Sequence, residues 1–193
     1  FMSLFLRVYQ KLYRSAFRCR YNRLFKSLGS KAYLVKPFRV DGGRDVQIED
    51  GTSFQRGAWL YCIGIENVDA MLHVGKDCIF GYNNHITSVR HVSIGDNVLT
   101  ANNIYISDNL HEYEDQTIPV MHQAIRFKSK VIIGDGAWIG ENVSIIGASV
   151  GRNSVIGANS VVTHDIPDFC VAVGAPARVI RQFDFEQKKW VNQ

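Results

Sequence analysis

A six-residue period of apolar side chains dominates the sequence between residues 48 and 162. The side chains fall in five groups of three, fourteen of the fifteen are apolar, and glycine directly follows seven of them. This period matches neither the 3.6-residue repeat of an amphipathic helix nor the two-residue alternation of a half-buried strand. It predicts a hexapeptide-repeat β-helix, a solenoid in which three short strands close one triangular coil and the coils stack. The positions are Ile48, Phe54, Leu60; Val74, Phe80, Ile86; Ile94, Thr100, Ile106; Ile133, Ile139, Ile145; and Val150, Ile156, Val162.

The repeat is interrupted at three places. First positions of successive groups are 26, 20, 39 and 17 residues apart, whereas three hexads occupy 18. The excess predicts a protruding loop over residues 107–130 and a smaller bulge over 61–73, and the deficit predicts a tightened coil before Val150. Because rigid scaffolds tend to carry their chemistry on loops, we expect the functional site at these interruptions.

The two ends of the chain depart from the repeat. Residues 1–30 show apolar and basic side chains at helical intervals up to Gly29, which predicts a basic amphipathic helix. Residues 1–40 carry ten Lys and Arg and no acid, whereas the remainder carries twelve against eighteen acids. Such a helix suits packing on the solenoid or on a neighbouring subunit, and equally contact with an anionic membrane. The β-helix domain is expected over 31–182, with regular coils from about Val46, and a short C-terminal helix over 183–193.

Composition narrows the class of protein. A chain of 193 residues, 46% hydrophobic, fits one folded domain with an appendage. It contains neither the roughly 18-residue apolar stretch that spans a bilayer nor a secretory signal pattern. Its four cysteines lack paired spacing, which favours reduced thiols over a disulfide framework or a metal site. We expect a cytoplasmic protein with no nucleic-acid partner, and possible peripheral contact with the cytoplasmic face of the inner membrane.

The protruding loop contains a candidate general base, His111, with Asp108 and Glu112 close by in the sequence. Imidazole titrates near neutrality and can relay a proton. A loop histidine is most often simply solvated. Two features favour a catalytic role. The repeat is interrupted here, and either of the two acidic neighbours could orient the ring.

Three segments in order resemble the hexapeptide-repeat O-acetyltransferases: IYISDNLHEYED, KSKVIIGDGAWIGENVSI and IGANSVVTHDIPDFCVAVGAPARVIRQF. That family includes galactoside, maltose and xenobiotic acetyltransferases and enzymes of bacterial O-antigen and capsule assembly. The likeness covers roughly residues 70–190, and the basic helix and the FDFEQKKW ending look most like the O-antigen and capsule enzymes. The resemblance implies a left-handed parallel β-helix, although crossovers between parallel strands are normally right-handed. It also implies a homotrimer with active sites between subunits.

The resemblance assigns roles to individual residues. His111 matches the catalytic histidine, Asn84 an asparagine that lines the acetyl-transfer site, and His85 a second acceptor-side position. The implied cosubstrate is acetyl-CoA, and no metal is required. Arginines after the terminal turn suit the phosphates of CoA because the guanidinium fork is planar and permanently charged. The implied CoA contacts are Trp138, Gly140, Ala158, Thr163, Arg178 and Arg181.

We therefore expect an acetyl-CoA-dependent O-acetyltransferase acting on a sugar hydroxyl in bacterial surface polysaccharide biosynthesis. His111 would be the general base of a direct transfer. The oxyanion would be stabilised by backbone N–H groups near Trp138 and Gly140 or by the Asn84 side chain. The carbohydrate acceptor is expected to be a lipid-linked oligosaccharide or a nucleotide sugar.

Three other functions remain open at this point. They are an N-acetyltransferase acting on an amino-sugar nucleotide, a γ-type carbonic anhydrase and a non-catalytic trimeric scaffold. The zinc site of a carbonic anhydrase of this type needs two histidines separated by four residues, and no pair in the chain has that spacing.

Overall fold

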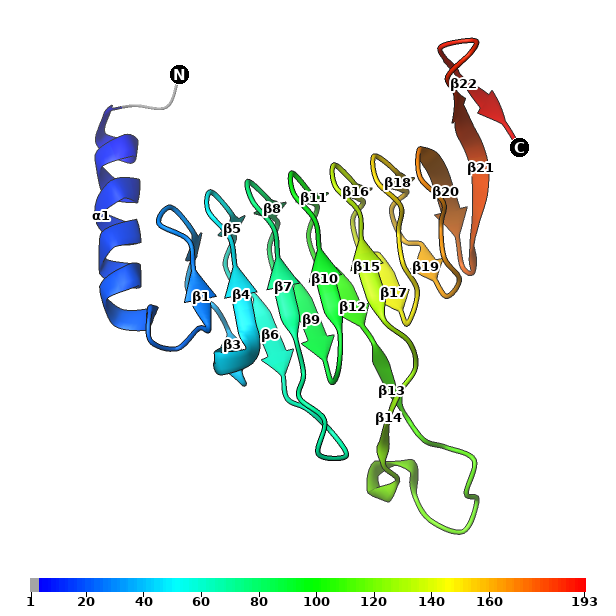
Figure 1. The fold of residues 1–193 in the computed structure, drawn as a ribbon, viewed down its shortest axis with the longest axis horizontal. Coiled ribbons are helices and arrows are strands. Elements are labelled where there is room, and N and C mark those ends of the chain that lie inside the picture. Colours follow the sequence, from blue (N-terminus) through cyan, green and yellow to red (C-terminus); the bar gives the residue numbers. More distant parts are fainter. Residues whose placement is uncertain (1–3) are drawn as a thin grey trace.

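The computed structural model describes residues 4–193, with side chains described from Lys11 onward. The chain forms a solenoid of stacked triangular coils, with one helix at its N-terminal end and a two-stranded hairpin rising from its C-terminal end (Figure 1). A second hairpin projects sideways from the middle of the solenoid.

Short parallel strands build the three faces of the solenoid. Face 1 contains β1 (Ser27–Leu28), β4 (Val46–Ile48), β7 (Leu72–Val74), β10 (Val92–Ile94) and β15 (Val131–Ile133). Face 2 contains β2 (Tyr33–Leu34), β5 (Ser53–Phe54), β8 (Ile79–Phe80), β11 (Leu99–Thr100), β16 (Trp138–Ile139), β18 (Val155–Ile156) and β20 (Cys170–Gly174). Face 3 contains β3 (Arg39–Asp41), β6 (Trp59–Cys62), β9 (His85–Ser88), β12 (Tyr105–Ser107), β17 (Ser144–Ile146) and β19 (Val161–Val162).

The predicted hexad positions form the core. All fifteen are buried, and Thr100, the polar one, is only 3% exposed. Equivalent hexad residues pair across neighbouring strands, so that Ile48 lies beside Val74 and Ile86 beside Ile106. The side chains therefore stack in columns, and the Phe54 and Phe80 rings lie parallel with centroids 4.0 Å apart.

The corner between faces 2 and 3 is held by a ladder of asparagines. Asn83, Asn103, Asn142 and Asn159 all have positive φ angles, between 55° and 60°. Each amide donates to the next one along the stack at 3.1–3.2 Å. Asparagine tolerates the left-handed conformation better than most residues, so it can serve both the turn and the ladder.

The solenoid begins one coil earlier than predicted. Helix α1 (Leu4–Tyr21) ends before Leu28, and β1, β2 and β3 form a complete coil ahead of Val46. The prediction of a helix reaching Gly29 was wrong because Leu28 belongs to the repeat. Leu28, Leu34 and Val40 are themselves six residues apart and pair with Ile48, Phe54 and Leu60 of the next coil.

Helix α1 covers the open N-terminal end of the solenoid (Figure 1). Phe17 is 4% exposed and belongs to the main hydrophobic core. The Tyr13 hydroxyl donates to the Leu34 carbonyl at 2.9 Å, and Arg18 donates to two carbonyls of the first coil, those of Leu28 and Gly29. Of the two uses predicted for this helix, packing on the solenoid is confirmed for its described side chains.

The C-terminal helix predicted over 183–193 is wrong. The chain instead forms an antiparallel hairpin of β21 (Ala177–Asp184) and β22 (Lys189–Asn192) that extends face 2. The Asp184 carboxylate accepts the N–H groups of Glu186 and Gln187, which fixes the turn. An aromatic cluster then favours the hairpin over a helix, and its rings are those of Phe169, Phe183, Phe185 and Trp190.

The four cysteines are free thiols. Cys62, Cys78 and Cys170 are buried, and burial, with smaller contributions from Asp45 and Asp108, raises the pKa of Cys62 to about 12. Cys19 is exposed on α1. No helix in the described part of the chain is long and apolar enough to cross a membrane.

Replacing Phe80 with alanine should lower the free energy of unfolding by about 3–5 kcal/mol, because it removes a fully buried ring from the stacked column. Urea denaturation followed by circular dichroism measures the change. Phe38→Ala is the matched control, since that ring is 72% exposed and its loss should change stability little. Equal effects of the two substitutions would contradict the core described above.

Candidate functional site

The protruding loop predicted over 107–130 is confirmed as a hairpin. The chain leaves face 3 after β12, forms β13 (Asn109–His111), turns through the 3-10 helix η2 (Val120–His122), and returns along β14 (Ile125–Phe127) to β15. In Figure 1 this hairpin extends well away from the solenoid. The bulge between β6 and β7 leaves from the same corner, so the two insertions lie on one edge of the molecule.

A buried carboxylate anchors the base of this hairpin. Asp108 is fully buried, and its oxygens accept the backbone N–H groups of Val89, Arg90 and His91 at 2.8–3.1 Å. The Ser88 hydroxyl also donates to one of these oxygens, at 3.3 Å. Several N–H donors converging on one carboxylate form a charge-assisted network that holds the hairpin to the preceding coil.

Arg90 joins the two insertions. Its guanidinium lies over the Phe127 ring of β14, 5.1 Å from the ring centroid, and also pairs with the Glu66 carboxylate in the bulge. Because the Arg90 backbone N–H is bound by Asp108 as well, one turn between β9 and β10 fixes both excursions.

His111 lies at the end of β13, opposite Ile125, and is exposed. Neither predicted orienting acid contacts it. Asp108 is occupied by the β9–β10 turn, and Glu112 lies 3.6 Å from Arg126 in an ion pair. Within the described residues of this chain, the imidazole has no hydrogen-bond or ion-pair partner, so it is available to groups outside the chain.

The predicted role of Asn84 in the site is not supported. Asn84 is fully buried, its amide donates to Thr100 at 2.9 Å and to the Gly81 carbonyl at 3.0 Å, and its oxygen accepts the Ile104 N–H. The side chain therefore stabilises the corner. The reason is its position on the inner side of the turn, where an unpaired amide would be expensive.

The backbone N–H groups predicted to stabilise the oxyanion are also occupied. The Trp138 N–H donates to the Ser154 carbonyl at 2.9 Å, and the Gly140 N–H donates to the Ile156 carbonyl at 2.8 Å. Both bonds belong to the ladder between neighbouring coils. These two N–H groups are therefore not free to stabilise an oxyanion.

His85 lies on the outer side of face 3, within an aromatic stack. Its ring is parallel to the Trp59 indole, with centroids 4.1 Å apart, and tilted against Tyr105 at 5.2 Å. Burial lowers the pKa of His85. The Trp59 indole is held in turn by the Asp41 carboxylate at 3.0 Å. His85 is thus a rigid, half-buried surface residue on the same face as the strand that leads to His111.

The residues predicted to bind CoA gather toward the C-terminal end of the solenoid. Trp138 is 51% exposed on face 2, in register with Leu99 and Val155. Ala158 is exposed at the corner after face 2, and Thr163 follows face 3, its hydroxyl 3.0 Å from His164.

The remaining predicted CoA contacts are two arginines and a glycine. Arg178 and Arg181 are exposed on β21. Gly140 is buried, and an added Cβ would lie 2.7 Å from the backbone nitrogen of Ala158. Close stacking of the coils therefore accounts for this glycine without a cofactor.

A single chain does not bring His111 and Trp138 together. Trp138 lies on face 2, whereas His111 lies on a hairpin that leaves the solenoid after face 3. The whole of face 3 separates the two departure points.

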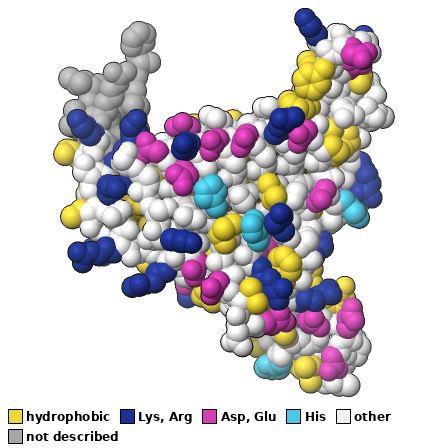
Figure 2. Space-filling view, in the orientation of Figure 1, with side chains coloured by type: hydrophobic (Ala, Val, Ile, Leu, Met, Phe, Trp, Pro, Cys, Tyr) yellow, Lys and Arg dark blue, Asp and Glu magenta, His cyan; other side chains and the backbone are white. Residues whose placement is uncertain are grey.

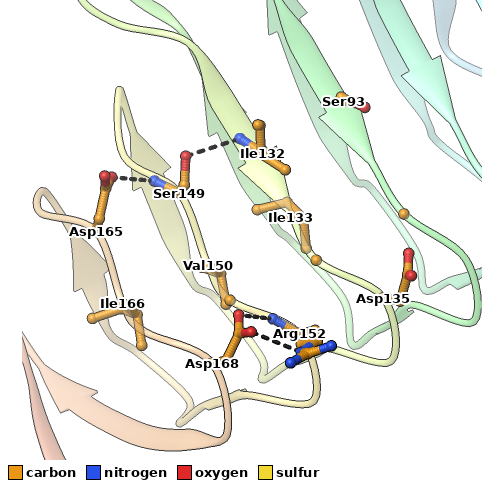
Figure 3. Close-up of a pocket in the computed structure, with 13 residues that line it drawn as sticks. Ser93, Ile132, Ile133, Asp135, Ser149, Val150, Arg152, Asp165, Ile166 and Asp168 are labelled. Atoms are coloured by element: carbon orange, nitrogen blue, oxygen red, sulfur yellow. Dashed lines mark hydrogen bonds and ion pairs between the residues drawn. The ribbon is translucent and has the colours of Figure 1, made fainter.

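A surface hollow of about 550 Å³ lies on face 1 near the C-terminal end (Figure 3). Several of its polar groups are already paired. Ser149 donates its N–H to Asp165 and accepts the Ile132 N–H, and Asp168 pairs with Arg152 at 2.7 Å (Figure 3). None of the predicted site residues lines this hollow. Within residues 4–193, no group of three or more His, Cys, Asp or Glu is arranged to hold a metal ion.

Replacing Asp108 with alanine should free the hairpin, because three backbone N–H groups then lose their acceptor, at about 1–3 kcal/mol each when buried. Hydrogen–deuterium exchange of residues 109–127 should become faster in this variant. Asp115→Ala is the matched control, since Asp115 bonds only within the exposed hairpin tip. Unchanged exchange in the Asp108 variant would show that the carboxylate is not the anchor.

Comparison with known proteins gives the family. The sequence-family model described as "Hexapeptide repeat of succinyl-transferase" matches residues 72–108 and 130–164. A protein of Mycobacterium tuberculosis named as an acetyltransferase is 34% identical over 186 residues, covering 91% of this chain; the chain spans only 61% of that relative's length.

Two further matches cover most of both aligned chains. WbbJ of Escherichia coli K12, named as a lipopolysaccharide biosynthesis O-acetyl transferase, is 33% identical over 160 residues, 76% of this chain and 77% of WbbJ. The solved structure of a galactoside acetyltransferase in complex with coenzyme A has a TM-score of 0.61 and 26% identity, covering 97% of this chain and 85% of its own. The chain therefore belongs to the hexapeptide-repeat acetyltransferases.

Proposed function

We propose that this protein transfers acetyl from acetyl-CoA to a sugar hydroxyl. The observation that carries the proposal is the exposed His111 imidazole, held on an anchored hairpin where the repeat is interrupted. The galactoside acetyltransferase bound to coenzyme A and the O-acetyl transferase named for lipopolysaccharide biosynthesis support this reaction class. The same likeness supports a left-handed coil.

We propose a homotrimer in which the site forms between subunits. One chain keeps His111 and Trp138 apart, so His111 of one subunit would approach face 2 of its neighbour. Two exposed apolar surfaces support such contacts. One is the outer column of face 2, and the other is the hairpin tip. Their exposed residues are Ile79, Leu99 and Trp138 on face 2, and Tyr113, Ile118, Val120 and Met121 on the tip.

The chemistry follows from an unpaired imidazole. His111 accepts the proton of the acceptor hydroxyl as its oxygen attacks the thioester carbonyl, giving a tetrahedral oxyanion. Collapse breaks the carbon–sulfur bond, and the imidazolium returns the proton to the departing thiolate. Sugar ester and free CoA are the products. The buried thiols of Cys62, Cys78 and Cys170 are not placed to form an acyl-enzyme.

CoA would lie along the C-terminal part of face 2. The half-exposed Trp138 ring offers a flat apolar wall, and Ala158 and Thr163 mark the neighbouring corners. Arg178 and Arg181 supply two exposed guanidiniums for the phosphates.

The acceptor side is formed by the hairpin and the bulge that Arg90 connects. His85, half-buried on face 3, is the acceptor-side residue we propose beside it. A carbohydrate of bacterial surface polysaccharide assembly, lipid-linked or nucleotide-linked, is the proposed substrate class, and the cytoplasm is the proposed location.

His111→Ala should lower kcat by ~10²–10⁴-fold, the usual contribution of a general base. The rate is measured as release of the CoA thiol in the presence of a panel of glycosides, with mass spectrometry of the products. His122→Ala is the matched control, because His122 is a second exposed histidine on the same hairpin. A His111 variant with near-normal kcat would refute the general-base assignment, and acetyl found on an amine would refute O-transfer.

Arg181→Gln should raise the KM for acetyl-CoA about tenfold with kcat nearly unchanged, because a charge-assisted phosphate contact is worth about 1.5–3 kcal/mol. Lys189→Gln, which removes an exposed charge from the other strand of the same hairpin, should leave KM unchanged. Equal KM values for the two variants would contradict phosphate binding by Arg181. Stoichiometric zinc in the purified protein would favour the carbonic anhydrase alternative.

A further inference from the structure

The positive charge of the sequence is concentrated at one end of the folded molecule. Residues 1–40 carry ten Lys and Arg and no acid. Figure 2 shows Lys and Arg side chains around the end that carries α1, while Asp and Glu side chains begin further along the solenoid. The hairpin that carries His111 leaves the solenoid three coils after the first coil.

Some of these cations are used to hold the fold. Arg18 donates to carbonyls of the first coil, Arg14 lies over the Tyr33 ring with 4.7 Å to its centroid, and Arg39 pairs with Asp41. Lys31 interacts electrostatically with Asp50. Six further cations are exposed and have no carboxylate within ion-pair distance in the described structure. They are Lys11, Arg20, Arg23, Lys26, Lys36 and Arg44.

The same end of the molecule carries exposed apolar side chains and a hollow. Leu12 is 66% exposed, Leu24 37% and Phe38 72%. A hollow of about 240 Å³ lies between α1 and the first coil, with Arg20 and Lys36 among its lining residues beside three aromatic rings. Cations interleaved with exposed leucine and phenylalanine are typical of surfaces that bind the headgroup region of an anionic bilayer.

We propose that the α1 end, defined by these six cations and three apolar side chains, docks on an anionic lipid membrane. Tyr13 and Phe17, two described side chains of α1, already pack on the solenoid, so we expect the attraction to be mainly electrostatic, without insertion of α1. Docking by this end directs the solenoid axis away from the bilayer. The coil that leads to His111 then stands three strand spacings, about 14 Å, from the first coil. The proposal goes beyond acetyl transfer and does not depend on it.

The test is co-sedimentation of the full chain with phosphatidylcholine vesicles, with and without phosphatidylglycerol. Binding should require phosphatidylglycerol and should fall as salt is raised, because exposed charges are screened. The combined variant Arg23→Gln, Lys26→Gln, Lys36→Gln, Arg44→Gln should lose more than a hundredfold in partitioning, at roughly fivefold for each cation near the surface. Its acetyl-transfer rate on a water-soluble acceptor should stay at the wild-type value.

The matched control removes four exposed lysines elsewhere: Lys76→Gln, Lys130→Gln, Lys188→Gln and Lys189→Gln. It changes the net charge equally and should retain vesicle binding. Equal loss in both variants would show attraction by overall charge and would overturn the proposal. No binding to anionic vesicles, or tighter binding to a nucleic acid than to those vesicles, would also overturn it.

Discussion

Everything in this molecule depends on the stacking of one coil on the next at a single strand spacing of about 4.8 Å. At that distance the backbone of each coil bonds the neighbouring coils, and each inward side chain contacts its equivalents above and below. The corners leave no spare volume. Gly140, where a Cβ would lie 2.7 Å from the next coil, and the asparagine ladder are both consequences of this constraint. Extra residues therefore leave the solenoid outward, as the hairpin and the bulge do.

The same constraint explains how a loop can hold a side chain in place. A hairpin that leaves a stacked coil starts from a rigid strand end. Here Asp108 binds the preceding turn, and Arg90 joins that turn to Phe127 and to the bulge. Rigidity is thus supplied at the base, while His111 further along the hairpin stays exposed.

The sequence predicted the interior better than the corners and the ends. Each hexad residue is buried inside its coil at a fixed spacing, so Ile133 and Val150 could be assigned to the core from the spacing alone. The first coil was missed because Leu28 also fits a helical pattern, although its spacing to Leu34 and Val40 carried the signal. The C-terminal hairpin depends on contacts among Phe183, Phe185 and Trp190, which no local period encodes.

The site itself was only partly predictable for a related reason. Asn84 was assigned from its match to an asparagine of the family, but its contacts depend on which way the corner turns the side chain, and the corner turns it inward. Asp108 or Glu112 was expected to orient His111 because both are near in sequence, yet Asp108 bonds a turn that lies 17–19 residues earlier in the chain. Position in the sequence located the loop, and only the packed structure shows which side chains on it are free.

The central claim is that His111 of one subunit acts with Trp138 of another. It is tested most directly by mixing His111→Ala chains with Trp138→Ala chains, each inactive alone, and reassembling them as trimers. If the site forms between subunits, every mixed trimer contains one site with both side chains intact, and acetyl transfer returns. If mixed trimers form and remain inactive, the two residues do not act together across a subunit interface.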